Sequence, residues 1–427
     1  MPSLYIGVND EKRNAWPDSS GPSRLGEQLV ADASRLAAAT RAADEGLTAR
    51  RQRPASRSVN AGLPVKRVFS RDHMAWFLLS MLIVGALVGV TSIEQRRVET
   101  RFPPIGRFAG VDRTRIHYTD SGRDTDAAPA IVLVHGASTS LLDFHASLVQ
   151  PLTRRHRVIT LDRPGHGYSA RGAAGAWPSP ADQARVVRGL LAALDVERPL
   201  LVGHSWAGSV VLAYLLEFPD EAAGAVLLAG GSHPWEGGVA WYNDLAGVPL
   251  LGPLFAYTLP LTAGRLGVSA GIASAFVPNA VPDHYRSRTG VDLTLRPRTF
   301  LANAEDIRLL SPFLERQCAR YAEIREPLLL ITGDSDPVVP AWNHTDRLIR
   351  QVPNAKRVVL EGTGHGLHHV HSEHVAALIH DFATTVDSDR LASSTRGWPA
   401  PTPRYGTHST PRQIVSGASR RGPDARL

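Results

Sequence analysis

Apolar and polar positions follow two patterns along the middle of the chain. Short continuous apolar runs are typical of strands that are buried on both faces of a parallel sheet. Amphipathic stretches between them, such as residues 180–195, predict helices that pack on that sheet. Strands alternating with helices indicate an α/β fold with a mostly parallel central sheet and right-handed crossovers. The predicted strands are residues 115–120 (one arm of an antiparallel hairpin), 130–135, 157–162, 200–203, 225–229, 328–332 and 357–361.

One apolar segment is much longer than these strands. Residues 74–93 contain no charged residue, and a helix of about 20 residues spans roughly 30 Å, the thickness of the hydrocarbon core of a bilayer. Charged residues flank the segment on both sides, and no clean small-residue cleavage site follows it. We therefore expect one uncleaved transmembrane helix. A core helix of a soluble protein is the alternative interpretation.

A second long segment interrupts the alternation of strands and helices. About a hundred residues separate the strand at 225–229 from the strand at 328–332, which is too long for a simple connection. They are rich in large apolar side chains and are broken repeatedly by proline and glycine. We predict a helical cap at 233–322, inserted between a first core part at 108–232 and a second at 323–386.

Composition separates the two ends of the chain from its middle. Residues 1–73 carry 12 Lys or Arg against 8 Asp or Glu, and residues 388–427 carry 7 against 2. Residues 108–387 carry 24 against 28, so the net charge of +7 on 427 residues belongs to the ends. We predict a disordered basic tail at 1–73, or in part a gene-model artefact, and a second disordered tail at 387–427.

The distribution of charge bears on partners and on orientation. No basic patch interleaved with aromatic residues indicates nucleic acid as a partner. Positive charges balance around 74–93, with four in the twenty residues before it and five in the twenty after it, so the positive-inside rule does not choose an orientation. Because twelve basic residues in the amino tail disfavour its translocation, we expect the globular domain on the extracytoplasmic side of the membrane.

The sequence Gly203-His204-Ser205-Trp206-Ala207 lies between a predicted strand and a predicted helix. In that context a G-x-S-x-G-like motif becomes a nucleophile elbow, whose sharp turn exposes the serine hydroxyl above the carboxyl ends of the strands. Small residues are needed two positions before and two positions after the serine, and Gly203 and Ala207 satisfy this need. An ordinary Gly–Ser turn is the alternative interpretation.

A serine hydroxyl becomes an effective nucleophile when a histidine takes its proton and a carboxylate orients that histidine. Asp336 and His365 each follow a predicted strand and are the candidates. Asp334 is the competing acid, and hydrogen bonding to the turn backbone is its alternative role. The order Ser205, Asp336, His365 matches the chain order of α/β-hydrolase triads.

Four motifs in this order resemble the α/β-hydrolase fold superfamily, over about residues 108–386. They resemble its capped branch of esterases and carbon–carbon bond hydrolases and comprise residues 135–138, residues 162–169, the elbow, and the acid and base loops. The resemblance implies that Ser205 is the nucleophile, His365 the general base and acid, and Asp336 the orienting carboxylate. The backbone N–H groups of Ala137 and Trp206 would bind the oxyanion.

A serine at the elbow indicates acyl transfer, because related epoxide hydrolases and haloalkane dehalogenases use an aspartate there. We expect a serine hydrolase, most simply a carboxylesterase, acting on a small hydrophobic acyl substrate beneath the apolar cap. A carbon–carbon bond hydrolase, a cofactor-free perhydrolase and a catalytically silent ligand receptor or scaffold are the alternatives. In the carbon–carbon bond hydrolase, a cap cation would bind a substrate carboxylate, with the candidates Arg265, Arg286, Arg288, Arg296 and Arg298.

Histidines cluster around and after the predicted base. The cluster comprises His365, His368, His369, His371 and His374. No H-E-x-x-H motif occurs and a triad histidine needs no metal, so we expect neither a metal nor a cofactor. The later histidines are expected to face solvent or to cap a helix, and three others are interpreted as turn residues: His135, His166 and His204. The single cysteine, Cys318, excludes a disulfide within the chain.

Overall fold

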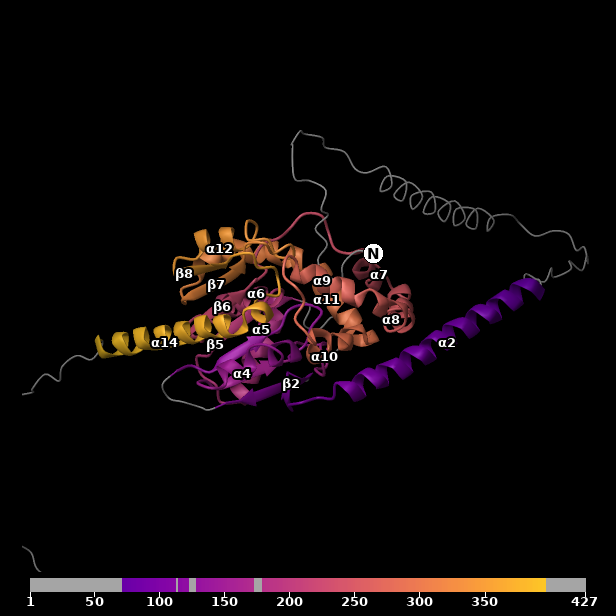
Figure 1. The fold of residues 1–427 in the computed structure, drawn as a ribbon, viewed down its shortest axis with the longest axis horizontal. Coiled ribbons are helices and arrows are strands. Elements are labelled where there is room, and N and C mark those ends of the chain that lie inside the picture. Colours follow the sequence, from indigo (N-terminus) through magenta and orange to yellow (C-terminus); the bar gives the residue numbers. More distant parts are fainter. Residues whose placement is uncertain (1–70, 113, 123–127, 173–178, 397–427) are drawn as a thin grey trace, which may run out of the picture.

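The computed structural model describes residues 71–396, except residue 113 and residues 123–127 and 173–178. The two predicted tails therefore lie outside the described residues, apart from 71–73 and 387–396. In the described part, an eight-stranded sheet lies at the centre of the domain, and helices pack on it (Figure 1).

The strand order confirms the predicted mostly parallel sheet. Across the sheet the strands follow the order β1-β2-β4-β3-β5-β6-β7-β8. The pairs β1–β2 and β2–β4 are antiparallel, and the other neighbouring pairs are parallel. The seven predicted strands are present, with their ends within two residues of the prediction: β2 (Thr114–Ser121), β3 (Ile131–Val134), β4 (Val158–Leu161), β5 (Leu200–His204), β6 (Gly224–Leu228), β7 (Leu328–Gly333) and β8 (Ala355–Leu360). The other arm of the predicted hairpin, whose bounds the sequence did not predict, is β1 (Arg107–Val111).

Side chains of the central strands alternate between two hydrophobic clusters, one on each face of the sheet. In β3, Val132 and Val134 pack on the face covered by α5 (Pro180–Ala193) and α6 (Ala207–Glu217). Ile131 and Leu133 pack on the opposite face with three helices: α3 (Leu142–His145), α4 (Val149–Leu152) and α14 (Ser372–Arg396). Because helices cover both faces, the strand is apolar at every position.

Between β6 and β7 the chain forms a helical insertion, as the sequence predicts, although the domain boundaries at 233 and 322 stay a prediction. Figure 1 shows α8, α10 and α11 between the sheet and α2. The insertion comprises α7 (Trp241–Ala246), α8 (Leu251–Thr258), η1 (Ala263–Leu266), α9 (Val268–Phe276), α10 (Tyr285–Thr289), η2 (Val291–Leu295), α11 (Pro297–Gln317) and η3 (Cys318–Glu323).

Helix α2 (Arg71–Arg101) extends beyond the predicted segment 74–93 at both ends. Only 6% of its most apolar part is buried against the rest of the molecule, and Figure 1 shows it projecting from the domain. Its carboxyl end packs on the insertion, where Val98 and Phe102 are buried in a cluster with residues of η2 and α9. In the part of the chain that the structure describes, α2 is the one helix long and apolar enough to cross a membrane.

Helix α14 differs from the predicted end of the core at residue 386. The helix continues to Arg396. Val386 is the last of its described side chains that is buried against the sheet.

Candidate active site

Ser205 lies on a sharp turn between β5 and α6. Its φ is +53°, a backbone conformation that is strained for a residue with a side chain. The Ser205 carbonyl accepts the N–H groups of Gly208 and Gly231 at 2.9 Å each, which hold the turn in place. A Cβ on Gly203 would lie 2.6 Å from the carbonyl oxygen of Ala207, so the position before His204 admits only glycine.

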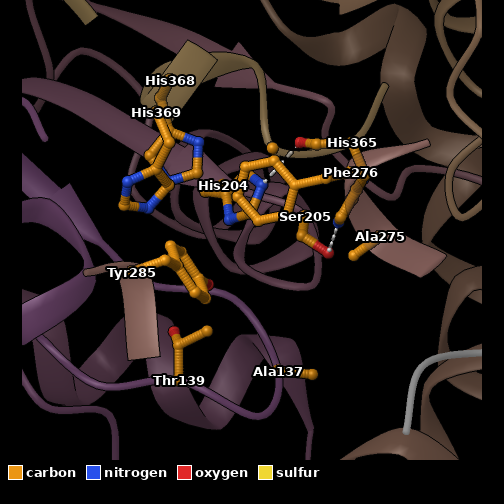
Figure 2. Close-up of a pocket in the computed structure, with 11 residues that line it drawn as sticks. Ala137, Thr139, His204, Ser205, Ala275, Phe276, Tyr285, His365, His368 and His369 are labelled. Atoms are coloured by element: carbon orange, nitrogen blue, oxygen red, sulfur yellow. Dashed lines mark hydrogen bonds between the residues drawn. The ribbon is translucent and has the colours of Figure 1, made fainter. Parts of the chain in front are cut away.

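The three side chains predicted as catalytic come together at the carboxyl ends of β5, β7 and β8. His365 Nε2 lies 2.9 Å from Ser205 Oγ (Figure 2), and His365 Nδ1 lies 2.8 Å from Asp336 Oδ2. All three side chains are buried. Because these strands are parallel, their carboxyl ends meet at one edge of the sheet, which brings residues about 160 positions apart into hydrogen-bond contact.

The two candidate acids have different surroundings. The second oxygen of Asp336, Oδ1, accepts the backbone N–H groups of Val338 and Val339 at 2.8 and 2.9 Å, which fixes the carboxylate. Asp334 is exposed, and its Oδ1 accepts the hydroxyl of Ser335 at 2.9 Å. The contact with His365 is therefore made by Asp336, the residue that the sequence favoured.

The loop after β3 brings Ala137 to the same cavity. The carbonyl of Gly136 accepts a bond from Arg163 Nη2 at 3.0 Å, and the N–H of Ser138 donates to Asn303 Oδ1 at 2.7 Å. These bonds hold both sides of the peptide unit whose N–H belongs to Ala137. In the hydrogen bonds found among the described residues, the N–H of Ala137 and the N–H of Trp206 donate to no other group.

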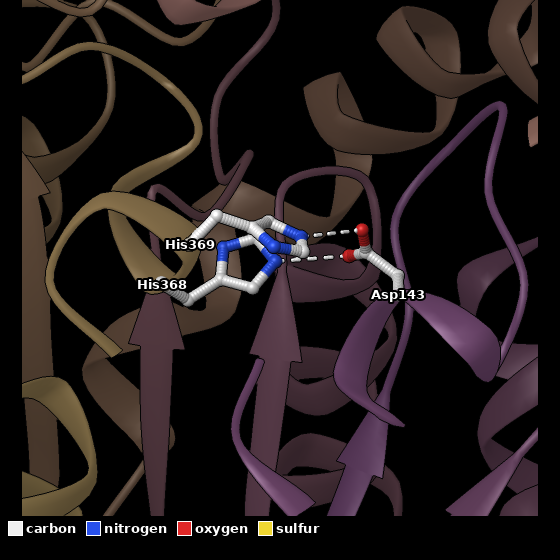
Figure 3. A group of neighbouring side chains, drawn as sticks. All are labelled: Asp143, His368 and His369. Atoms are coloured by element: carbon white, nitrogen blue, oxygen red, sulfur yellow. Dashed lines mark hydrogen bonds and ion pairs between the residues drawn. The ribbon is translucent and has the colours of Figure 1, made fainter. Parts of the chain in front are cut away.

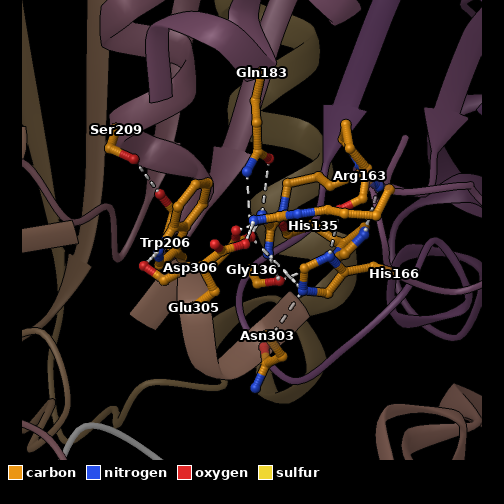
Figure 4. Close-up of polar contacts among 12 residues, drawn as sticks. His135, Gly136, Arg163, His166, Gln183, Trp206, Ser209, Asn303, Glu305 and Asp306 are labelled. Carbon is orange, nitrogen blue, oxygen red and sulfur yellow. Dashed lines mark hydrogen bonds and ion pairs between the residues drawn. The ribbon is translucent and has the colours of Figure 1, made fainter. Parts of the chain in front are cut away.

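A buried arginine from the motif at 162–169 supports this loop (Figure 4). The Arg163 guanidinium is only 1% exposed, donates to the His135 and Gly136 carbonyls at 2.9 and 3.0 Å, and pairs with Asp306 of α11 at 2.6 Å. It also lies 4.2 Å above the indole ring of Trp206, whose Nε1 donates to the Asp306 carbonyl. Burial lowers the pKa of His135 to about 3, so that imidazole is neutral. Arg163 and helix α11 therefore help to position both predicted oxyanion residues, Ala137 and Trp206.

The cavity beside Ser205 is small and closed by the insertion. Its volume is about 10 Å³, close to the space of one water molecule. Phe276 and Tyr285 come from the insertion and contact each other edge to face, with ring centroids 5.0 Å apart. The lining residues are Ala137, Thr139, His204, Ser205, Ala275, Phe276, Tyr285, His365, Gly366, His368 and His369 (Figure 2).

The loop that carries His365 is hydrogen-bonded to the insertion. The backbone N–H of His365 donates to the Ala275 carbonyl at 3.1 Å. Asn279 receives the N–H of Gly364 at 2.9 Å and donates to the Gly362 carbonyl at 2.9 Å. The predicted base and the insertion are therefore held together by one backbone–backbone hydrogen bond and two hydrogen bonds of the Asn279 side chain.

Two of the histidines after His365 require a correction, whereas His374 is exposed as expected. His368 and His369 do not face solvent or cap a helix; their Nε2 atoms lie 2.9 and 2.8 Å from the two oxygens of the buried Asp143 (Figure 3). These three side chains are close enough together to hold a metal ion. The reason is that α13 (Leu367–Val370) begins two residues after His365 and its first turn faces α3. His368 and His369 therefore reach Asp143 instead of solvent.

The charges in this cluster follow from its burial. Burial would raise the pKa of Asp143, but the charge and hydrogen bonds of His369 and His368 hold it well below its usual value. Burial lowers the pKa of His368 to about 4 and that of His204 well below 6.5. His204 lines the cavity beside the rings of His365 and His368, at 4.9 and 4.2 Å between centroids. The imidazoles of His204 and His368, which line the cavity, are therefore neutral at pH 7.

The five arginines considered as anion-binding groups lie away from this cavity. Three are paired with carboxylates and two are exposed: Arg265 with Glu94, Arg286 with Asp292, Arg296 with Glu99, and the exposed Arg288 and Arg298. Among the described residues that line the cavity, none is an arginine or a lysine.

Comparison with known proteins identifies similar chains. The family described as alpha/beta hydrolase fold matches residues 129–372. A 2-hydroxy-6-oxononadienedioate/2-hydroxy-6-oxononatrienedioate hydrolase from Burkholderia vietnamiensis is 29% identical over 278 residues, covering 63% of this chain and 90% of that protein. An uncharacterized hydrolase of Bacillus subtilis, YugF, is 28% identical over 291 residues, covering 65% and 97%.

Solved structures also resemble this fold. The crystal structure of the enol-lactonase from Burkholderia xenovorans LB400 superimposes with a TM-score of 0.54 at 21% identity, covering 65% of this chain and all of that one. At that identity the likeness concerns the fold alone.

Proposed function

This chain belongs to the α/β hydrolase fold family, and from that premise we propose that it is a serine hydrolase that cleaves an ester or related acyl bond of a small hydrophobic substrate. The observation that carries the proposal is the chain of hydrogen bonds from Asp336 through His365 to Ser205. It supplies a nucleophile, a base in contact with it and a carboxylate in contact with the base.

In the proposed reaction, Ser205 Oγ attacks the acyl carbon and His365 Nε2 takes the hydroxyl proton. Asp336 holds Nδ1–H of the imidazole and stabilises the imidazolium that forms. His365 then gives the proton to the leaving alcohol, and an acyl-enzyme remains on Ser205. A water molecule, activated by the same histidine, releases the acid and restores the serine.

The oxyanion is proposed to bind between the N–H groups of Ala137 and Trp206. Support comes from the two peptide units that carry them, whose carbonyls are held by Arg163 and by Gly208 and Gly231. Donors that are fixed before the reaction stabilise the developing charge without reorganising during it, and one such donor is worth about 10²–10³ in rate.

The closed cavity bears on how a substrate enters. A volume of about 10 Å³ does not accommodate an acyl group beside Ser205. Phe276 and Tyr285 are the apolar side chains of the insertion that line it, so their movement is the proposed route of access. An aromatic wall of this kind supports a hydrophobic substrate.

The test is covalent labelling of the full-length protein in detergent by a fluorophosphonate. Wild type should be labelled and Ser205→Ala should not, whereas Ser335→Ala, which removes an exposed serine of the acid loop, should be labelled like wild type. Labelling that persists in Ser205→Ala would overturn the assignment of the nucleophile. Failure of wild type to react would favour a catalytically silent fold.

A carbon–carbon bond hydrolase is the second candidate, and the 29% identity to the Burkholderia vietnamiensis enzyme favours it. That enzyme's name denotes a substrate with two carboxylates, whereas the described lining of this cavity has no arginine or lysine. We therefore place ester cleavage first. Measuring turnover of p-nitrophenyl butyrate and of a vinylogous diketone separates the two reactions. An esterase should prefer the first substrate and a carbon–carbon bond hydrolase the second.

We further propose that α2 anchors the enzyme in a membrane as a single span, with the hydrolase domain on the extracytoplasmic side. The exposed apolar surface of α2 and its length support anchoring. The twelve basic residues of the amino tail support the orientation. Protease protection in sealed vesicles tests it, because the hydrolase domain should be digested only on the proposed side.

A further inference from the structure

We propose that the insertion docks into the lipid bilayer beside α2, with the apolar surface around α8 among the acyl chains. The inference rests on the proposed anchoring by α2 and does not depend on the proposed chemistry. We define the docking surface by its large, exposed apolar side chains: Val248, Leu250, Leu251, Leu254, Tyr257, Leu259 and Leu266.

The sequence of this surface is unusually apolar for a loop and a short helix. Residues 245–264, between Asp244 and Arg265, are twenty consecutive residues without a charge. Helix α8 uses only eight of them, which gives about 12 Å of helix, too short to cross the roughly 30 Å of a hydrocarbon core. A segment of this composition that cannot span the bilayer fits an interfacial position in it.

The side chains on this surface are held outward. Leu250 is 86% exposed and Leu266 is 81% exposed. Leu250 also has a φ of +66°, a conformation that is strained for leucine. Soluble monomeric proteins rarely expose contiguous apolar patches of this kind, which mark interaction surfaces. A strained leucine pointing away from the protein core indicates a partner outside the chain.

The depth of the docking surface in the bilayer follows from the contact between α8 and α2. Side chains of α2 that are half-buried (Val84, Leu87 and Val88) or buried (Thr91) recur every three or four residues and therefore form one face of the helix. Helix α8 contacts α2, and Figure 1 shows the two side by side. These positions lie inside the uncharged segment 74–93, and Val84 is roughly 14 Å from its end along the helix axis. A bilayer that surrounds residues 74–93 therefore also surrounds α8.

Charged residues of α2 and of the insertion begin at the same depth, just beyond the uncharged segment 74–93. Beyond residue 93, α2 carries Glu94 and Glu99, which pair with Arg265 and Arg296 of the insertion. An open cleft of about 1050 Å³ lies at this level, and its charged lining residues are two glutamates, Glu99 and Glu305, and five arginines: Arg115, Arg171, Arg296, Arg298 and Arg308. Apolar side chains at the depth of the acyl chains, followed by arginines at the depth of the headgroups, match the polarity of a bilayer interface.

The test measures the depth of single labels on the full-length protein in phosphatidylcholine–phosphatidylglycerol vesicles. In a Cys318→Ser background, a fluorescent nitrobenzoxadiazole label is placed at Leu250→Cys or Leu266→Cys. Trp342→Cys is the matched control, because Trp342 is also apolar and 71% exposed but precedes α12 (Thr345–Gln351), which lies far from α2 in Figure 1. Leu82→Cys reports on the anchor itself.

We expect iodide in the water to quench the labels at 250 and 266 several-fold less than the label at 342, and doxyl lipids to quench them strongly. Glutamate at both Leu250 and Leu251 should restore iodide quenching at 266. The melting temperature of every variant reports folding, and fluorophosphonate labelling reports the proposed chemistry independently of docking.

Three results would overturn docking. Iodide quenching at 250 equal to that at 342, with 82 protected, would leave α2 as an anchor and place the insertion in water. Iodide quenching at 82 as well would mean that α2 itself is not inserted. Protection at 250 from both iodide and doxyl lipids would indicate cover by protein, such as a second copy of the chain.

Discussion

Two aspartate–histidine arrangements have histidines that line the cavity beside Ser205, and the distances between carboxylate oxygen and imidazole nitrogen are almost the same in both. Asp336 lies 2.8 Å from His365, and Asp143 lies 2.9 and 2.8 Å from His368 and His369. All of these carboxylates are buried. The two arrangements differ in what the other ring nitrogen of the histidine contacts.

His365 directs its other nitrogen to the hydroxyl of Ser205 at 2.9 Å. The other nitrogen of His368, Nδ1, is buried and has no hydrogen-bond partner among the described residues. Asp143 also divides its two oxygens between two imidazoles, whereas Asp336 gives its second oxygen to backbone N–H groups. A carboxylate–histidine contact is thus common to both, and contact with a nucleophile distinguishes the proposed catalytic pair.

Removal of the two histidines should separate the pairs most strongly. In His365→Asn, kcat for p-nitrophenyl butyrate should fall by about 10⁵–10⁶-fold, because no base remains for Ser205. In His368→Asn, kcat should stay within about tenfold of wild type, since that imidazole contacts Asp143 instead. An equal loss in His368→Asn, with an unchanged melting temperature, would show that the second arrangement takes part in the reaction.

The next largest difference is expected between variants of the two carboxylates, Asp336 and Asp143. Asp336→Asn keeps the shape of the side chain but loses the charge that stabilises the imidazolium, so we expect kcat to fall by about 10⁴-fold. Asp143→Asn should destabilise the fold by about 1–3 kcal/mol, because the amide keeps one acceptor oxygen and one of the two imidazoles faces an NH2 group instead, with little change in kcat. Urea unfolding and steady-state rates on both variants check this, and a stable Asp143→Asn with a kcat as low as Asp336→Asn would contradict it.

The stability of the protein should fall in acid. Burial lowers the folded-state pKa of five histidines from 6.5 to about 3 or 4: His135, His156, His233, His344 and His368. Below pH 6.5 the unfolded chain binds protons that these folded imidazoles do not, so each contributes a loss of up to about 1.4 kcal/mol per pH unit, down to its folded pKa. Urea unfolding between pH 7 and 5 measures the slope.

His368→Asn sharpens this measurement. It removes one of these five histidines, so the slope of stability against pH should be shallower than in wild type by the contribution of one histidine. A slope that is unchanged in the variant would mean that His368 is not neutral in the fold.

The smallest effect is expected at the competing acid. Asp334→Asn should change kcat by less than about twofold, because Asp334 is exposed and its carboxylate contacts Ser335 rather than His365. The matched variant is Asp336→Asn, two residues along the same loop. A loss in Asp334→Asn comparable to that in Asp336→Asn would reverse the assignment of the two carboxylates.

Local patterns in the sequence predict much of this molecule. The strands were predictable because each is a short apolar run, and helices cover both faces of the sheet. The elbow was predictable because its tight turn restricts the residue types around Ser205, as the 2.6 Å approach at Gly203 illustrates. The long apolar helix follows from composition alone.

The second aspartate–histidine arrangement could not be predicted in the same way. Asp143 and His368 are 225 positions apart, and no local pattern relates them. The spacing of His365, His368 and His369 was a usable signal, but its direction depends on how α13 packs against α3. The same holds for Arg163, whose ion pair with Asp306 joins the core to a helix of the insertion.

The hydrogen bonds between the insertion and the His365 loop restrict how this enzyme can be re-engineered. Hydrolases of this architecture invite exchange of the insertion to change specificity. Here a donor segment that does not place a backbone carbonyl where that of Ala275 lies, or that lacks the side-chain amide of Asn279, would release the loop 362–365 that carries the base. A chimaera would therefore have to retain residues 275–279 with the recipient's core, and the boundary for grafting lies inside the insertion rather than at its ends.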